Sequence, residues 1–496
     1  MSINSIIKYI SVIIILLFFY SLYHRAPHVD DAWLGEHAYW QSKIGFVKSE
    51  LMHGLTQQED KLLCHHKLLT LQGALFINAF GFSPITLKSV SFIYYLVFLF
   101  VFYFYTSKKI FSKSEVYVAL LLLISNSIVF EYSFVFRPEI PLMTLGFISY
   151  IFLDKSLKNK QHRYSFVILS GVLSGLCVST HLNGIIFPAA GFLLFIWNKK
   201  YLQSLIFGLS SIQVILIYFY DFTSNYNIDY WLFQINKSPM LSGSSGLPSG
   251  ISYLMNLLTE HMRFFHSPKE ISLSVLFIIS FIISFKYIKI HKNLLRFTLL
   301  LVVLLAVISV HKTSKYIILY LPYLIILLTG SLKNIYVKSN SDILFKNISY
   351  YAIKSFVFSL VVIYMALHTF FNFRIATNKW TEDINRNIVS TYITGNTYEC
   401  RIVAPMTFIF NEITRFRSIQ SELCYSEMQK SDNTIYKQGF LELAKFYNID
   451  YIILSEFFIT KLGMDCISEP EIKNCNFQVL LNKKEVMILK NINSRN

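Results

Sequence analysis

Charged side chains are scarce in this chain. Of its 496 residues, only 15% are Asp, Glu, Lys or Arg, whereas 54% are hydrophobic and 17% are aromatic. A soluble domain typically carries about 25% charged residues, so this chain has too few to cover a surface that faces water on every side. The composition argues against a simple cytosolic enzyme, a disordered protein and a nucleic-acid-binding protein. It indicates an integral membrane protein.

Several motifs are also absent from the sequence. It contains no Gly-rich phosphate loop, no Walker motif and no metal-type Cys/His spacing, which argues against a nucleotide-driven pump. It shows no internal repeat of the kind that marks many transporters. The formal net charge of +16 does not indicate nucleic acid, because the Lys and Arg residues lie mostly in short loops between apolar runs.

Long apolar runs are what the sequence does have. A helix needs about 20 mainly apolar residues to cross a bilayer. We expect about eleven membrane spans, at residues 6–23, 86–106, 115–133, 140–154, 164–181, 184–197, 201–220, 270–285, 297–311, 316–331 and 352–373. The first span lacks a small-residue cleavage site, so we expect it to be retained rather than removed as a signal peptide.

The loops between these spans alternate in charge. Loops 107–114, 155–163, 198–200, 286–296 and 332–351 are basic, and the loops on the other side are acidic, neutral or sparsely basic. Since Lys and Arg concentrate on the cytoplasmic side of membranes, the alternation predicts a multi-pass protein of the cell (inner) membrane with a cytoplasmic N-terminus. The first outer loop is then 24–85, and the C-terminal part is extracytoplasmic.

The C-terminal residues differ in composition from the rest. Residues 1–373 form the expected transmembrane domain, whereas 374–496 alternate β-rich runs with an amphipathic helical stretch, which predicts a small α/β domain. Four of the six cysteines lie there, Cys400, Cys424, Cys466 and Cys475. An oxidising compartment permits disulfides, so we expect at least one. The sequence does not choose among the three pairings, and free buried thiols are the alternative.

Two adjacent carboxylates stand just after the first span. Asp30 and Asp31 open the segment Asp30-Asp31-Ala-Trp-Leu-Gly-Glu-His-Ala-Tyr. Their repulsion would couple their titrations and favour protonation of one of them, which suits a general base. The alternative is structural: the pair caps the helix that follows, since Asp is favoured at helix starts.

Two further segments carry charge at expected outer helix ends. Arg137-Pro-Glu139 offers an arginine that could bind phosphate with both arms of its fork, beside a carboxylate that could orient it or bind a sugar hydroxyl. Its alternative is a structural ion pair at a helix break made by proline.

The segment Lys312-Thr-Ser-Lys315-Tyr316 places cations on the outer face, against the usual bias, as candidates for an anionic ligand. Its alternative is snorkelling toward lipid headgroups. His181, in a short outer turn, is a weaker candidate, because a lone histidine there is more often structural.

These segments, in this order and on one side, resemble the membrane-embedded C-type glycosyltransferases. The similar branch holds protein O-mannosyltransferases and bacterial aminoarabinose transferases. The family has an Asp-Asp or Asp-Glu pair in its first outer loop, an Arg-Pro-Asp-like element after the third span, and a basic-x-x-(Lys/Arg)-Tyr element before a late span. Here Glu139 replaces the Asp of the second element. The resemblance covers roughly residues 1–375.

The resemblance implies transfer of a sugar from a polyprenyl-phosphate carrier to an acceptor hydroxyl on the outer membrane face, with inversion. Its partners would be the lipid-linked donor, a glycan, lipid or protein acceptor, and membrane lipids, with no nucleic acid. Asp30 would be the general base. The other residues implied in substrate binding are Asp31, Arg137, Glu139, His181, Lys312, Lys315 and Tyr316. No metal ligand and no cofactor are assigned, and a divalent cation is left open.

Two other classes of function remain open from the residues alone. A transporter or flippase of a lipid-linked glycan would favour charges buried in the middle of spans, whereas the charged clusters here lie at helix ends. A non-enzymatic membrane scaffold that displays residues 374–496 would give no reason for Asp30, Arg137 and Lys315 to lie on one face.

Overall fold

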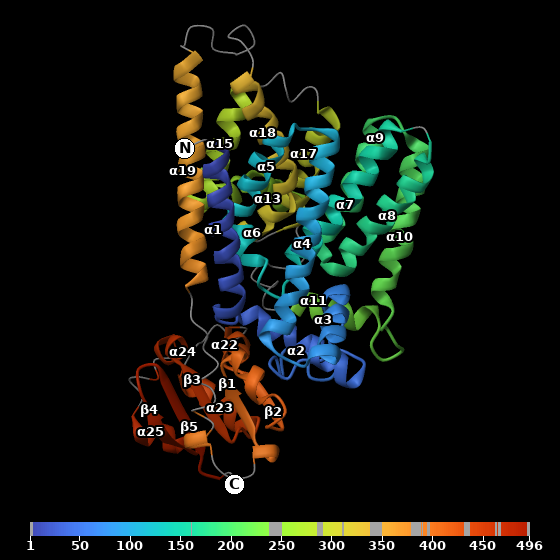
Figure 1. The fold of residues 1–496 in the computed structure, drawn as a ribbon. Helices are drawn as coiled ribbons and strands as arrows, with labels where there is room; N and C mark the ends of the chain where they lie inside the picture. Colours follow the sequence, from blue (N-terminus) through green and yellow to red (C-terminus); the bar gives the residue numbers. More distant parts are fainter. Residues whose placement is uncertain are drawn as a thin grey trace.

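The molecule has two parts, a bundle of long helices and a smaller domain beyond one end of it (Figure 1). The computed structural model describes residues 3–159, 161–237, 250–284, 291–309, 312–337, 350–377, 388, 390–393, 397–430, 437–461, 464 and 468–493. We call the end of the bundle beside the smaller domain the domain end, and the opposite end the far end.

The bundle is made of helices from the first 376 residues. They are α1 (Ile3–His24), α2 (Val29–Ile44), α3 (Lys67–Phe80), α4 (Pro84–Lys109), α5 (Lys113–Ser125), α6 (Ser127–Tyr132), α7 (Glu139–Lys158), α8 (Arg163–Thr180), η1 (Leu182–Ile185), α9 (Ile186–Trp197), α10 (Tyr201–Leu216), η2 (Ile217–Phe219), α11 (Ile228–Lys237), α13 (Gly250–Leu258), α14 (His261–Phe264), α15 (Pro268–Ile283), α17 (Lys292–Ile308), η3 (Ser314–Leu319), α18 (Leu321–Val337) and α19 (Tyr350–Ala376).

Each of the eleven expected spans coincides with one or more of these helices. The span expected at 115–133 is interrupted at Asn126, whose side chain caps α6 by accepting from the backbone N–H groups of Ile128 and Val129. Among the described residues, five helices are long and apolar enough to cross a membrane alone, or six if a pair bent by 99° is one span. The number of spans therefore stays a prediction.

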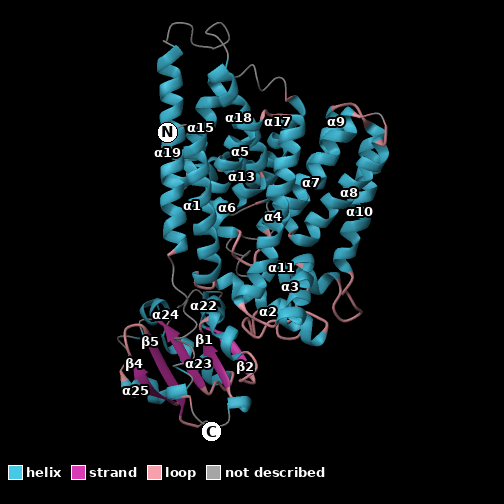
Figure 2. Cartoon of the chain, viewed as in Figure 1, coloured by secondary structure: helices cyan, strands magenta, loops and turns pink. Residues whose placement is uncertain are grey.

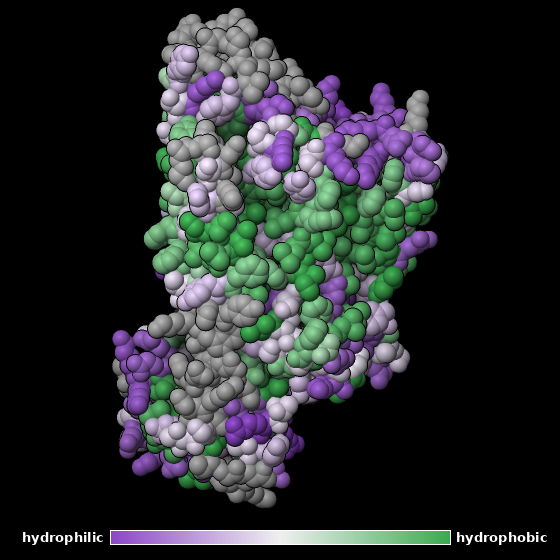
Figure 3. Space-filling model, viewed as in Figure 1, coloured by the Kyte–Doolittle hydropathy of each residue, from purple (hydrophilic) through white to green (hydrophobic). Residues whose placement is uncertain are grey.

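The outer faces of the helices are apolar. Phe100, Leu216 and Phe358 keep 60% or more of their surface exposed. Figure 3 shows a broad hydrophobic band over the helices, with hydrophilic side chains at the far end and on the smaller domain. Helices that are apolar on both the buried and the exposed face are typical of a membrane-embedded bundle.

The smaller domain is built on one mixed sheet (Figure 2). Its strands are β1 (Arg401–Ala404), β2 (Ser418–Ser421), β3 (Tyr451–Ser455), β4 (Phe477–Asn482) and β5 (Val486–Asn491), in the order β2-β1-β3-β5-β4. β1 pairs in parallel with β2 and β3, whereas β5 pairs antiparallel with β3 and β4. Its helical elements are η5 (Thr397–Glu399), η6 (Met406–Phe408), α21 (Ile409–Glu412), α22 (Glu422–Lys430), α23 (Lys437–Phe446), α24 (Glu456–Lys461) and α25 (Glu469–Asn474).

The cysteines of this domain lie in its interior. Cys424 and Cys475 are buried free thiols, so neither takes part in the expected disulfide. Cys400 is buried beside β1, and Cys466 lies outside the described residues. Burial raises the pKa of the Cys424 thiol, which keeps it protonated and poorly nucleophilic at neutral pH.

The segment between α2 and α3 joins the two parts of the molecule. Ser421 at the end of β2 donates from its backbone N–H (3.0 Å) and its hydroxyl (2.8 Å) to the carbonyl of Leu51. The ring of Phe82, just before α4, stacks on Phe410 of α21 at 5.3 Å. One hydrophobic cluster runs from α2 and this segment into the sheet. The smaller domain is thus packed against the helix that carries Asp30 and Asp31.

Glu50 is the charged contact of this junction. Its carboxylate accepts from Ser418 at 2.9 Å, is paired with Lys48 at 2.7 Å and lies 3.6 Å from His53. Burial raises the pKa of Glu50, but the nearby His53, the hydrogen bond and charge of Lys48 and the hydrogen bond from Ser418 outweigh it and hold the pKa at about 2.

We expect acid to weaken this junction. Because the folded pKa of Glu50 lies below its ordinary value, its stabilisation is present above about pH 4.5 and is lost as the pH falls toward 2. The full loss is on the order of 3 kcal/mol. Thermal unfolding of the full chain between pH 6 and pH 3 measures the larger part of this loss, with Glu50→Gln as the control. An equal pH dependence in wild type and variant would contradict the role of Glu50.

Candidate active site

The start of α2 fixes the two adjacent aspartates in different surroundings. His28 is the N-cap, and its imidazole accepts from the backbone N–H of Asp30 at 3.1 Å. Asp31 closes the capping box by accepting from the backbone N–H of His28 at 2.7 Å. The capping role considered for the pair thus belongs to Asp31.

Asp31 is fully buried between three segments. One oxygen accepts from the backbone N–H of Phe136 at 2.6 Å, and the other lies 3.7 Å from the ammonium of Lys88 on α4, which is also fully buried. Gly35, one turn further along α2, allows this approach, since a Cβ there would overlap Leu87. These contacts make Asp31 the residue that positions α2 against α4 and the segment before α7.

Asp30 points to a different partner. Its side chain is 18% exposed, and its carboxylate accepts from Nη1 of Arg137. Arg137 in turn donates from Nε and Nη2 to the carboxylate of Glu139 at 2.9–3.2 Å. The guanidinium therefore joins two carboxylates from separate helices at the domain end.

The backbone around Pro138 sets this geometry. Arg137 exchanges hydrogen bonds with the hydroxyl of Ser91 on α4, and α7 begins directly after Pro138. Glu139 lies in the first turn of α7, where the helix dipole favours a negative charge. The ion pair expected at a helix break is present, and the same arginine also reaches Asp30.

Lys315 is the second cation beside this group. It is the second residue of η3 and acts electrostatically on both Glu139 and Arg137. Among the described residues its ammonium has no hydrogen bond or ion pair, and it lies 5.5 Å from the ring centroid of Tyr316. Burial lowers the pKa of Lys315, and Glu139 opposes that shift. It is a partly buried cation without an anion of its own.

Lys312 belongs to another cluster. Its ammonium pairs with Glu260 at 3.1 Å and donates to the carbonyls of Ala306 and Ser309 at 2.8 and 2.9 Å. Arg263, fully buried, also donates to Glu260 at 2.7 Å and reaches the carbonyl of Thr313 at 2.7 Å. These contacts tie the segment before η3 to α14, so Lys312 has a structural partner where Lys315 has none.

His181 and Tyr316 line the same region. The imidazole of His181 stacks on His66 with ring centroids 4.8 Å apart, and its Nε2 lies 3.4 Å from the hydroxyl of Tyr316. Burial lowers the pKa of His66 to about 4 and that of His181 well below its usual value. Both rings are therefore neutral at pH 7. They add polar surface and no positive charge.

The structure brings Asp30, Arg137, Glu139 and Lys315 to one place, with His181 and Tyr316 beside them. Asp31 and Lys312 lie nearby in separate buried ion pairs. The residues of these arrangements that were not predicted include Lys88, Glu260, Arg263 and His66. Lys88 falls inside the apolar run 86–106, where a lone charge calls for a buried partner, and that signal could have found it. His66 had no distinguishing signal in the sequence.

No set of metal ligands accompanies the cluster. The described residues contain no group of three or more His, Cys, Asp or Glu side chains that could hold a metal ion. The divalent cation left open by the sequence therefore has no ligand set in the described part of the chain. Arg137 pairs directly with Asp30, and Lys315 lies beside Arg137 and Glu139.

Comparison with known proteins identifies the fold. Residues 71–223 match the profile of the dolichyl-phosphate-mannose-protein mannosyltransferase family, a stretch that includes Arg137 and Glu139. No curated protein sequence matches the chain.

Solved structures match over almost the whole chain. ArnT from Cupriavidus metallidurans in the apo state aligns with a TM-score of 0.61 and 10% identity, over 98% of both chains. The same protein bound to undecaprenyl phosphate gives 0.60 and 10%, over 99% of both. The apo oligosaccharyltransferase from Archaeoglobus fulgidus gives 0.58 and 10%, over 98% of this chain and 74% of that one.

Proposed function

The fold of the membrane-embedded C-type glycosyltransferases is the premise from which we propose a function. We propose that the chain transfers a sugar from a polyprenyl-phosphate carrier to an acceptor hydroxyl at the domain end of its helices. Asp30 serves as the general base, and the sugar is transferred with inversion. The observation that carries this proposal is the direct pairing of Asp30 with Arg137, beside Lys315, a second cation with no ion pair among the described residues.

The chemistry requires one base. Asp30 accepts the proton of the acceptor hydroxyl, and the oxygen attacks the anomeric carbon from the side opposite the phosphate. The bond between that carbon and the phosphate oxygen breaks, and its electron pair stays on the phosphate. Hydrolysis of a glycoside usually needs a second carboxylic acid to protonate the leaving oxygen. A phosphate leaves as a stable anion, so no second acid is required to protonate it.

The cations stabilise the leaving phosphate. Asp30 and Glu139 carry two negative charges, and Arg137 and Lys315 carry two positive ones, so the cluster is balanced before the donor binds. The phosphate of the donor adds a negative charge, and the ammonium of Lys315 can form an ion pair with it. A guanidinium that turns from Asp30 toward the phosphate leaves Asp30 a better proton acceptor. Charges placed in advance around the departing group lower the barrier in this way.

We also propose that the domain end faces the outside of the cell. The loops that join helices at the far end, among them 107–114, 155–163 and 198–200, are basic, as expected of the cytoplasmic side. The smaller domain and the Asp30 cluster then lie on the outer face, in the inner membrane of the cell. A lipid-linked donor would reach the cluster from the outer leaflet.

A matched pair of lysine variants tests the proposal. Mass spectrometry of surface glycans and lipids from a deletion strain should show one missing sugar, which the wild-type gene restores. Lys315→Ala should reduce the restored sugar about 100-fold at a normal protein level, since it removes a charge placed for the leaving group. Lys312→Ala should instead reduce the amount of folded protein, because it leaves Glu260 in a broken buried pair.

The deletion strain and the Lys315→Ala variant test the transferase activity and the role of Lys315 separately. A deletion strain with an unchanged glycan and lipid profile would contradict the transferase, and would return the flippase and the scaffold to consideration. A missing sugar that Lys315→Ala restores fully would leave the transferase in place and remove Lys315 from phosphate binding.

A further inference from the structure

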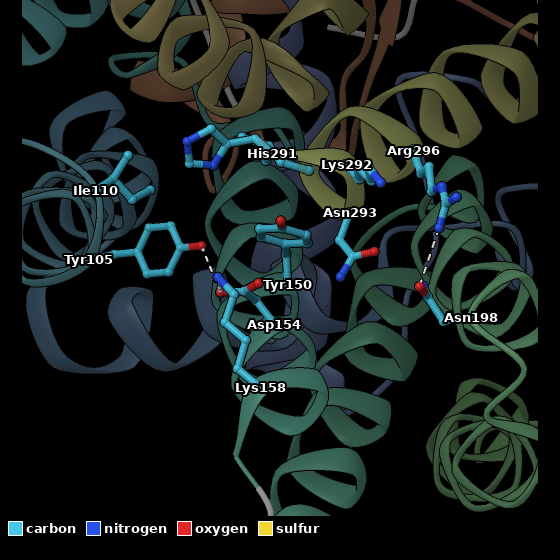
Figure 4. A pocket seen from close by; sticks show the side chains of 11 residues that line it. Tyr105, Ile110, Tyr150, Asp154, Lys158, Asn198, His291, Lys292, Asn293 and Arg296 are labelled. Atoms are coloured by element: carbon cyan, nitrogen blue, oxygen red, sulfur yellow. Dashed lines mark hydrogen bonds and ion pairs between the residues drawn. The ribbon is translucent and has the colours of Figure 1, made fainter. Parts of the chain in front are cut away.

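A pocket at the far end of the helices lies apart from the Asp30 cluster. Its volume is about 520 Å³, within the roughly 300–1,000 Å³ typical of small-molecule sites. It is formed where the ends of α4, α7 and α9 meet the start of α17, with Tyr105, Tyr150 and Asn293 on its walls (Figure 4). The reaction proposed above makes no use of it.

The acidic group of the pocket is already neutralised. Asp154 is paired with Lys158 at 2.7 Å and accepts from the hydroxyl of Tyr105 at 3.1 Å. Figure 4 shows these three side chains together on one side of the pocket. They bring no net charge to it.

Two cations remain on the other side. Lys292 and Arg296 lie one turn apart on α17, so their side chains share a face of the helix. Within the described residues neither has an acidic partner. Arg296 donates from Nη1 to the side-chain oxygen of Asn198 at 3.3 Å (Figure 4), which leaves most of its fork unused. With Asp154 neutralised by Lys158, the described residues of the pocket carry a net positive charge of about two and no unpaired anion.

Exposed aromatic side chains beside the pocket indicate that it lies at the depth of the lipid headgroups. The guanidinium of Arg296 stacks on the ring of Trp197 at 4.8 Å, and Trp197 is 50% exposed. Tyr201, at the start of α10, is 66% exposed. Exposed Trp and Tyr side chains mark the boundary between hydrocarbon and headgroups. The first turn of α17, which also lines the pocket, carries backbone N–H groups without acceptors inside the helix.

We propose that this pocket binds the phosphate headgroup of an anionic membrane lipid in the leaflet at the far end, through Lys292, Arg296 and the first turn of α17. A guanidinium fork and a neighbouring ammonium match the charge and geometry of phosphate oxygens. Basic pockets between helix ends on this side of membrane proteins suit such headgroups. The proposal does not depend on the transferase chemistry.

Thermal unfolding of the purified full chain in neutral detergent tests the site. Phosphatidylglycerol should raise the midpoint by a few degrees, because a ligand that binds only the folded state stabilises it. Phosphatidylcholine and inorganic phosphate should not. The double variant Lys292→Gln/Arg296→Gln should lose most of the shift. The matched control Lys108→Gln/Lys113→Gln removes two exposed cations from the same end, outside the pocket, and should keep the shift.

Each other outcome overturns the proposal. An equal loss in both double variants would show a general effect of surface charge. An equal shift with inorganic phosphate, lost in the pocket variant, would show a site for a free anion and not for a lipid. If the double variant does not fold, Lys292→Glu alone reverses a charge on an exposed residue, and a full lipid shift in that variant would equally contradict the site.

Discussion

Asp30→Asn is expected to lower sugar transfer by about 100- to 10,000-fold, the usual contribution of a general base, in a protein that still folds and inserts. Asparagine keeps the size of the side chain and an oxygen for Arg137, but it does not accept the proton of the acceptor. Folding should persist because Asp30 is partly exposed and Arg137 keeps its bonds to Glu139. Transfer in membranes from the deletion strain, normalised to protein level, measures the effect.

Activity of Asp30→Asn within a few-fold of wild type would exclude Asp30 as the base. Glu139→Gln serves as the comparison, because it also removes one negative charge next to Arg137 but leaves Asp30 intact. If Asp30 is the base, Glu139→Gln should be the milder variant. If both variants lose activity equally, the balance of charge around Arg137 explains the loss and not proton transfer.

Asp31→Asn is expected to reduce the amount of folded protein, and not mainly the rate of transfer by the protein that does fold. Removing one member of a buried ion pair costs about 3–5 kcal/mol, and this change leaves the ammonium of Lys88 without its carboxylate. The yield of inserted protein and its unfolding temperature should both fall, whereas activity per folded molecule should fall far less than in Asp30→Asn.

A second substitution separates a positioning role from contact with substrate. In Asp31→Asn/Lys88→Met the buried charge is gone, and the asparagine oxygen still accepts from the backbone of Phe136. The double variant should regain part of the stability that Asp31→Asn loses, and sugar transfer should recover together with the folded protein. If stability returns while transfer stays absent, Asp31 acts on the substrate and the positioning role is wrong.

Much of the candidate site follows from the sequence alone. Charged residues are costly at membrane helix ends unless they are paired, so Asp30, Arg137 and Lys315 stand out against apolar runs. Their common side follows from the alternation of basic loops. The likeness to the C-type glycosyltransferases, inferred from the same segments, is confirmed by the fold.

The division of roles within each pair does not follow from the sequence. Asp30 and Asp31 are neighbours of the same type, and they differ because distant segments bring Arg137 to the first and Lys88 and the backbone of Phe136 to the second. Lys312 and Lys315 differ in the same way, because Glu260 faces the first. Such choices depend on packing between distant segments, which the local pattern of residues does not contain.

The junction between the segment after α2 and strand β2 has a consequence for exchange between relatives. Leu51 and Glu50 bind Ser421 and Ser418, and the same segment continues from the helix that carries Asp30. The smaller domain is therefore not an independent module on a tether. A chimera that exchanges the C-terminal residues alone would place surfaces from two different proteins against each other at this junction. An exchange that also includes residues 45–66 would keep the two contacting surfaces from the same protein.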